Sequence, residues 1–88
     1  MKVYFSKKFE KELDKITDPS LKKNVSKAVK ILLDANSLVA VPNLKKMKGQ
    51  KNAYRIRVGN YRIGFYLEKS ELFIVTVAHR SDIYKYFP

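Results

Sequence analysis

Residues 54–67 read YRIRVGNYRIGFYL, with apolar side chains at every second position on both sides of Gly59-Asn60. Alternation with a period of two is typical of a strand with one buried face. A Gly-Asn dipeptide between two such runs fits a two-residue hairpin turn. The pattern therefore predicts a β-hairpin with strands over 54–58 and 61–67.

The turn also predicts the register of this hairpin. With two residues in the loop, Arg57 lies opposite Arg62, and Arg55 lies opposite Gly64. The apolar side chains then share one face, which helices must cover, and the arginines share the other face. Like charges placed directly opposite each other destabilise a ladder by up to about 1 kcal/mol. An anion bound between the arginines would explain why the pair is present.

The surrounding residues are basic as well. Guanidinium groups match the geometry of phosphate with two parallel hydrogen bonds, so this region is a candidate for binding a nucleic-acid backbone. The alternative is an ordinary solvated face, with arginine selected for its strand propensity. No acidic residue occurs between positions 45 and 62, whereas seven basic ones do: Lys45, Lys46, Lys48, Lys51, Arg55, Arg57 and Arg62.

Two helices are predicted before the hairpin. Apolar residues at helical spacing indicate a first helix over 7–17, with Ser6 as its N-cap. Asp18-Pro19 reads as an N-cap followed by proline at the first helical position, and the second helix should extend to about Ala35. The short connection between them suggests an antiparallel helical hairpin.

The remaining segments complete an α+β pattern. Residues 2–5 are β-prone, 72–78 form a continuous apolar run suited to a central strand buried on both faces, and 81–88 can add a turn of helix. We expect one small domain over residues 1–88, in the order β-α-α-β-β-β with a short final helix. The helical hairpin should pack on one face of a mainly antiparallel sheet.

The composition limits what such a domain can be. A chain of 88 residues builds one modest core, and 45% hydrophobic residues suffice for it. Without cysteine there is no disulfide, thiolate metal site or cysteine nucleophile. No apolar run reaches the roughly 18 residues of a membrane span. The start, MKVYFSKKFEKEL, also lacks the apolar stretch of a signal peptide, so we expect a soluble cytoplasmic protein.

The net charge of +11 is large for so small a surface. Self-repulsion at this density destabilises the compact state, which favours a polyanionic partner such as nucleic acid, an acidic protein segment or an anionic membrane. The chain could also simply be a basic protein with no such partner.

A second cluster of polar groups follows the last predicted strand. His79 and Arg80 stand at the strand end, and Tyr84 comes shortly after them. A lone histidine is usually structural, but one at the end of a rigid strand beside basic residues can also transfer protons. A terminal tyrosine usually packs, although its hydroxyl can serve a polar site.

Three segments together resemble the RelE/ParE superfamily of type II toxins: KKMKG at 45–49, YRIRVGNYRI at 54–63 and HRSDIY at 79–84. The resemblance covers nearly the whole chain, including the helical hairpin. It implies a microbial toxin that a co-expressed antitoxin neutralises. RelE-like members cleave mRNA, typically in the ribosomal A site, without a metal or other cofactor. ParE-like members share the fold and inhibit DNA gyrase.

The resemblance also implies roles for individual residues. The RelE-type active-site arginine falls on Arg62, the basic residue after the last strand on Arg80, and the C-terminal tyrosine on Tyr84. Members of the superfamily vary at the position of His79, where other basic residues also occur. These four residues are the expected catalytic set of an endoribonuclease that forms a 2′,3′-cyclic phosphate.

One departure changes the expected chemistry. RelE-type enzymes carry lysines where this chain has Arg55 and Arg57. Arginine stays protonated, so these two residues should bind phosphate and not act as bases. Proton transfer is then left to His79 and Tyr84.

The expected partners follow from the charge and the resemblance. They are a cognate acidic antitoxin, disordered alone, together with mRNA and the ribosome. A membrane is not expected, because neither helix combines a strongly cationic face with bulky apolar anchors. Two alternatives stay open: a ParE-type gyrase inhibitor, or a non-catalytic nucleic-acid-binding relative.

Overall fold

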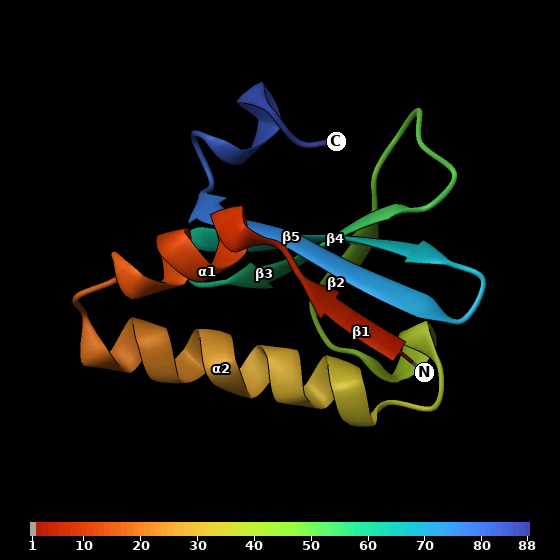
Figure 1. Ribbon diagram of the computed structural model, residues 1–88, viewed down its shortest axis with the longest axis horizontal. Coiled ribbons are helices and arrows are strands. Elements are labelled where there is room, and N and C mark those ends of the chain that lie inside the picture. Colours follow the sequence, from red (N-terminus) through yellow and green to blue (C-terminus); the bar gives the residue numbers. More distant parts are fainter. Residues whose placement is uncertain (1) are drawn as a thin grey trace.

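The computed structural model describes residues 2–88 and has an α+β fold with five strands. Figure 1 shows how the helices and strands are arranged. Two α-helices follow the first strand, one short 3-10 helix follows the second α-helix, and another follows the last strand. The elements are β1 (Lys2–Phe5), α1 (Lys7–Asp14), α2 (Pro19–Asp34), η1 (Leu38–Ala40), β2 (Leu44–Lys46), β3 (Ala53–Val58), β4 (Tyr61–Glu68), β5 (Glu71–His79) and η2 (Ile83–Lys85).

The sheet is mixed, with the strand order β1-β5-β4-β3-β2. β1 runs parallel to β5, and the other neighbours are antiparallel. The predicted fold class, a helical hairpin on one face of a mainly antiparallel sheet, is confirmed. The predicted central position of the apolar run 72–78 is confirmed as well, because β5 lies between β1 and β4.

The sequence prediction was wrong on one strand and on one helix end. β2 was not expected, because its three residues contain a single apolar side chain and show no alternation; pairing with β3 creates it. The first helix ends at Asp14 and not at residue 17. A tighter turn follows, with the Ile16 amide bonded to the Leu13 carbonyl at 3.1 Å, because the chain must become extended before Pro19.

Both helix starts form as predicted. The hydroxyl of Ser6 accepts a hydrogen bond from the Phe9 amide at 3.0 Å. The carboxylate of Asp18 accepts one from the Ser20 amide at 3.0 Å, and Pro19 begins α2. These caps satisfy amides that have no partner within the helix, and so fix where each helix begins.

The hairpin register is confirmed in full, with Arg57 opposite Arg62 and Arg55 opposite Gly64. The alternate apolar side chains of β3, β4 and β5 pack against α1 and α2. The buried members of this main core include Phe9, Val25, Leu32, Ile56, Ile63, Phe65, Leu72 and Ile74.

The opposite side of the sheet, called the outer face below, carries a different set of structures. Figure 1 shows α2 beneath the sheet, whereas the C-terminal segment, residues 82–88, and the β2–β3 loop, residues 47–52, rise on the other side. A second small core forms there around Ala53, Ala78, Ile83 and Phe87. No helix within residues 2–88 is long and apolar enough to cross a membrane.

Candidate nucleic-acid interface

The arginines of the hairpin lie on the outer face. Lys45 pairs with Arg55 across β2 and β3, and Arg57 pairs with Arg62 across β3 and β4. Since Arg55 lies opposite Gly64, Arg62 is its diagonal neighbour, at a distance typically of about 7–8 Å. These four residues form one continuous surface, called the basic face below.

A hollow of about 350 Å³ opens over one end of the basic face. The C-terminal segment contributes Tyr84 to it, with a side chain that is 53% exposed. Lys51 lines an adjoining hollow on the β2–β3 loop. The fold thus brings together most of the residues predicted to bind nucleic acid and one predicted catalytic residue. The lining residues are Lys45, Lys46, Met47, Lys48, Arg55 and Tyr84.

Arg62 is half-buried and held by the turn of its own hairpin. One terminal nitrogen, Nη1, donates to the carbonyl oxygens of Gly59 at 3.0 Å and Tyr61 at 2.9 Å. Its Nε is buried and has no partner among residues 2–88. The guanidinium is therefore oriented by backbone carbonyls and retains unused donor capacity.

None of the arginines forms an ion pair with another side chain of residues 2–88. Two ion pairs occur within residues 2–88, Lys8 with Glu12 and Lys85 with Asp82, and neither involves an arginine. Charges that are not neutralised by the protein attract anions from solution, and arginine does so with directional hydrogen bonds. This supports the reading of the basic face as an anion-binding surface.

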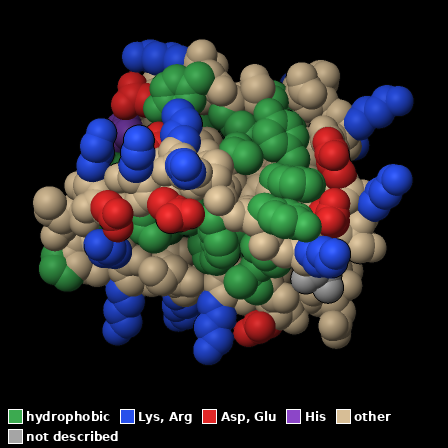
Figure 2. Space-filling view, viewed as in Figure 1, with side chains coloured by type: hydrophobic (Ala, Val, Ile, Leu, Met, Phe, Trp, Pro, Cys, Tyr) green, Lys and Arg blue, Asp and Glu red, His purple; other side chains and the backbone are tan. Residues whose placement is uncertain are grey.

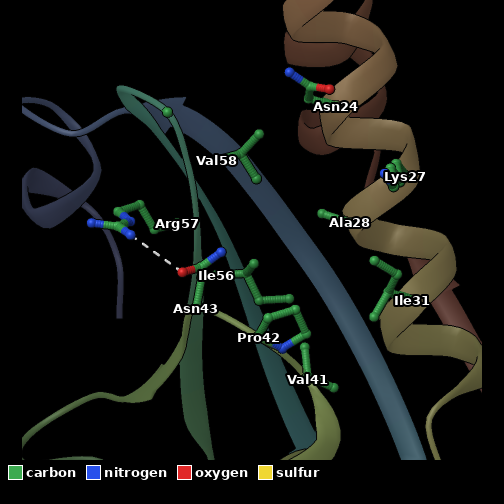
Figure 3. Close-up of a pocket in the computed structure, with 11 residues that line it drawn as sticks. Asn24, Lys27, Ala28, Ile31, Val41, Pro42, Asn43, Ile56, Arg57 and Val58 are labelled. Atoms are coloured by element: carbon green, nitrogen blue, oxygen red, sulfur yellow. Dashed lines mark hydrogen bonds between the residues drawn. The ribbon is translucent and has the colours of Figure 1, made fainter.

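Arg57 lies at the margin of this surface and also borders a second groove, drawn in Figure 3. Its Nη2 donates to Oδ1 of Asn43 at 3.3 Å. Figure 3 shows Arg57 on the side of β3 away from α2, whereas Ile56 and Val58 point toward the helix. The groove has a volume of about 250 Å³. It lies between α2 and β3, on the helix-covered side of the sheet.

Arg80 follows β5 and is exposed. Its backbone amide donates to the Asn60 carbonyl at 2.7 Å, which ties the end of β5 to the hairpin turn. Arg62 is tied to the same turn through Gly59. Arg57, Arg62 and Arg80 therefore belong to the turn end of the sheet, whereas Arg55 and Tyr84 belong to the hollow.

His79 is placed differently from the other predicted catalytic residues. It pairs with Tyr61, and the two rings meet edge to face at 5.6 Å. Because side chains alternate along a strand, His79 shares the helix-covered side with Tyr61, while Arg62 lies on the outer face beside Ala78. Its Nδ1 accepts from the Ser81 amide at 3.1 Å. The structure thus separates His79 from the hollow.

Exposed aromatic residues form another feature that was not predicted. Figure 2 shows a band of hydrophobic side chains across the side of the molecule that includes β1. Tyr4 and Phe5 on β1 are 44% and 43% exposed, and the ring of Tyr4 stacks on Phe73 at 5.0 Å. A hydrogen bond to the Glu71 carboxylate raises the pKa of Tyr4, which keeps that hydroxyl protonated.

Sequence reasoning also missed two contacts of the C-terminal segment. Gly64 lies under Phe87, and Lys8 lies over the ring of Tyr86. The contact of Gly64 with Phe87 had one signal in the sequence, which is a glycine at an outer-face position of an otherwise regular alternation. Nothing in the sequence pattern indicated the contact of Lys8 with Tyr86.

Comparisons with known proteins find a matching family and a similar relative. Residues 3–84 match the family described as ParE toxin of type II toxin-antitoxin system, parDE. The chain is 40% identical over 89 residues to Toxin RelE3 of Methanocaldococcus jannaschii, with both chains covered completely.

Solved structures share the fold. The RelB-RelE antitoxin-toxin complex from Methanococcus jannaschii matches with a TM-score of 0.80 and 38% identity, covering 97% of this chain and 99% of that one. The chromosomal ParDE system from P. aeruginosa matches with a TM-score of 0.67 over 90% of this chain and 95% of that one. At 15% identity, the second likeness concerns the fold alone.

Proposed function

Since this chain belongs to the ParE toxin family of type II toxin-antitoxin systems and is RelE-like, we propose that it is a metal-independent endoribonuclease that cleaves mRNA on the ribosome and inhibits translation. One observation supports this most directly. Arginines without acidic partners among residues 2–88 line the outer face, and a tyrosine lines the hollow at one end of it. Such a surface can bind an RNA backbone and stabilise the negative charge that develops during its cleavage.

The proposed reaction is an internal phosphoryl transfer. The ribose 2′-oxygen attacks the adjacent phosphorus, a new O2′–P bond forms, and the P–O5′ bond breaks. The 2′-hydroxyl loses a proton and the leaving 5′-oxygen gains one, so the products are a 2′,3′-cyclic phosphate and a 5′-hydroxyl. The reaction needs proton transfer and positive charge around the phosphate.

The residues divide these tasks by position. Arg62 and Arg80, at the turn end, supply charge to the developing phosphorane. Arg55 and Arg57 hold the backbone, together with the lysines of the hollow. Tyr84 is assigned the proton transfer, because it is exposed and lines the same hollow as Arg55. Arginine cannot take that role, since it stays protonated.

The direct test is product analysis. The purified protein is added to a translating extract and, separately, to the same mRNA without ribosomes. We expect cleaved mRNA with 5′-hydroxyl and 2′,3′-cyclic phosphate ends in the extract. The proposal would be contradicted if the protein arrests growth but leaves the mRNA intact in both reactions.

Salt dependence tests the role of the basic face. If four cations each neutralise one phosphate of single-stranded RNA, the logarithm of the binding constant should fall with a slope of about −2.8 against log salt. Binding should then weaken about 50-fold between 50 and 200 mM salt. Arg55→Gln should reduce the slope by about 0.7, whereas Lys30→Gln on exposed α2 should leave it unchanged. RNA binding that does not change with salt concentration would contradict the proposal that the basic face binds RNA phosphates.

His79→Gln tests whether His79, which lies away from the hollow, takes part in proton transfer. We expect a loss of cleavage below about 10-fold, less than removal of a proton-transfer group causes. Cleavage kinetics and the melting temperature should be measured on the same preparation. A loss of more than about 100-fold with an unchanged melting temperature would return proton transfer to His79.

A second function, inhibition of DNA gyrase, is favoured by the description of the matched family as ParE toxin. This function would use the same fold as a protein-binding module without chemistry of its own. Loss of plasmid supercoiling with intact mRNA would select it. Retained RNA binding without cleavage or gyrase inhibition would instead select a non-catalytic relative.

The partner in either case is a cognate antitoxin, as the solved RelB-RelE complexes support. We propose that its toxin-binding segment is acidic, because this chain carries +11. An acidic segment laid over the basic face would neutralise the arginines and exclude RNA.

A further inference from the structure

We infer that Gly64 and Lys8 are positioning residues for Tyr84, because they clasp the C-terminal segment onto the outer face of the sheet. The clasp has two parts, the space above Gly64 that receives Phe87, and the contact of Lys8 with Tyr86. The inference rests on the proposed function, since it concerns the group that would transfer a proton.

Gly64 provides space that a larger residue would fill. It lies in the middle of β4, opposite Arg55 and away from any turn. A Cβ atom at this position would stand 2.9 Å from Cδ2 and Cε2 of Phe87, and 2.9 Å from Cγ2 of Thr76. Carbon atoms do not approach one another so closely, so even alanine would have to displace the ring or the strand. Close approach of another group is a known reason for glycine inside a strand.

Phe87 fills this space. Its side chain is 3% exposed, and its ring meets Tyr66 edge to face at 5.2 Å. Ile83, from the other end of the same short segment, is fully buried in the same small core. The segment is thus anchored at two points four residues apart, separately from the main core beneath the sheet.

Lys8 joins the segment to α1 and β5. Its Nζ lies 3.8 Å from the ring centroid of Tyr86, and 3.2 Å from both Oγ1 of Thr76 and Oε2 of Glu12. Glu12 in turn accepts from the Thr76 hydroxyl at 2.7 Å. The ammonium is therefore fixed by two oxygens while it contacts the aromatic face, which is a favourable geometry for a cation–π interaction.

Tyr84 lies between these anchors. Ile83 is buried on one side of it, and Tyr86 and Phe87 are held on the other. Its own side chain is exposed and lines the hollow with Arg55. A displacement of about 1 Å at a reacting group can cost about 100-fold in rate. The clasp therefore fixes the position of the proposed proton-transfer group through residues that do not line the hollow.

The test begins with Gly64→Ala. We expect kcat for RNA cleavage to fall about 10- to 100-fold while KM changes less than about 3-fold, because the basic face remains intact. Hydrogen exchange supplies a readout that does not depend on activity. The amides of Lys85, Tyr86 and Phe87 bond to the carbonyls of Asp82 and Ile83, and they should exchange faster while β3–β5 stay protected.

Two further variants separate positioning from general damage. Phe87→Leu combined with Gly64→Ala removes ring atoms from the contact and should recover most of the lost kcat. Lys8→Met should lower kcat about 3- to 10-fold through the loss of one clasp contact. Lys7→Met, at the neighbouring exposed position, is the matched control and should act as the parent protein does.

Each outcome decides a separate point. Faster exchange in Gly64→Ala with unchanged cleavage would overturn the positioning role. Unchanged exchange in Gly64→Ala would overturn the clasp itself. If the parent protein does not cleave RNA, the proposed function and the positioning role both fall, and exchange still shows whether Gly64 holds the segment.

Discussion

Arg62→Ala is expected to lower the rate of RNA cleavage by about 100- to 1,000-fold, the usual cost of removing one preorganised charge donor from a developing anion. Arg62 is the arginine with the most defined orientation. Nη1 is bonded to two turn carbonyls, and Nε is buried without a partner in the described part of the chain, residues 2–88. Its guanidinium therefore need not reorganise when charge develops on the phosphate. Single-turnover cleavage of a short RNA measures the effect.

The variant should remain folded, because it replaces a half-buried side chain and removes a charge that faces Arg57. A melting temperature within a few degrees of the parent protein is the control for folding. Lys30→Ala, an exposed cation on α2, is the control for loss of charge alone.

Arg62→Lys separates charge from geometry. A lysine keeps the charge but not the planar fork, so most of the loss of cleavage rate should persist.

Arg80→Ala, like Arg62→Ala, should abolish growth arrest when the protein is induced. Full toxicity of both alanine variants would exclude the two arginines from the reaction.

The fold was predictable where local chemistry determines it. The alternation on both sides of Gly59-Asn60 fixed the hairpin and its register, and the caps Ser6 and Asp18 fixed both helix starts. β2 was not predictable, because a three-residue strand forms only through its pairing with β3. Such pairing is a tertiary contact and leaves no periodic pattern in the sequence.

The candidate site was predictable in composition and only partly in geometry. The basic residues of the hairpin were found because they share one face and lack acidic neighbours. His79 was grouped with them on account of its proximity in the chain to Arg80, but side chains alternate along a strand, and pairing with Tyr61 puts it on the helix-covered side. The docking of Phe87 on Gly64 joins residues 23 positions apart, which no spacing rule could indicate.

Tyr84→Phe is expected to lower kcat for cleavage by at least about 100-fold while RNA binding stays unchanged, because the variant keeps the ring and removes only the hydroxyl. The side chain is 53% exposed, so the variant should melt as the parent protein does. Tyr86→Phe is the matched control, since that tyrosine is also exposed, does not line the hollow, and in the variant keeps the ring that Lys8 contacts.

Tyr84→Ala distinguishes proton transfer from base stacking. If the ring also stacks on a nucleobase, alanine should weaken RNA binding by about 1–3 kcal/mol beyond the effect of phenylalanine. If phenylalanine cleaves as well as tyrosine and only alanine fails, the hydroxyl has no part in the chemistry. Tyr84 would then orient the scissile nucleotide, and the proton would have to move through a group outside the hollow. His79→Gln, measured in the Tyr84→Phe background, would then show whether that group is His79.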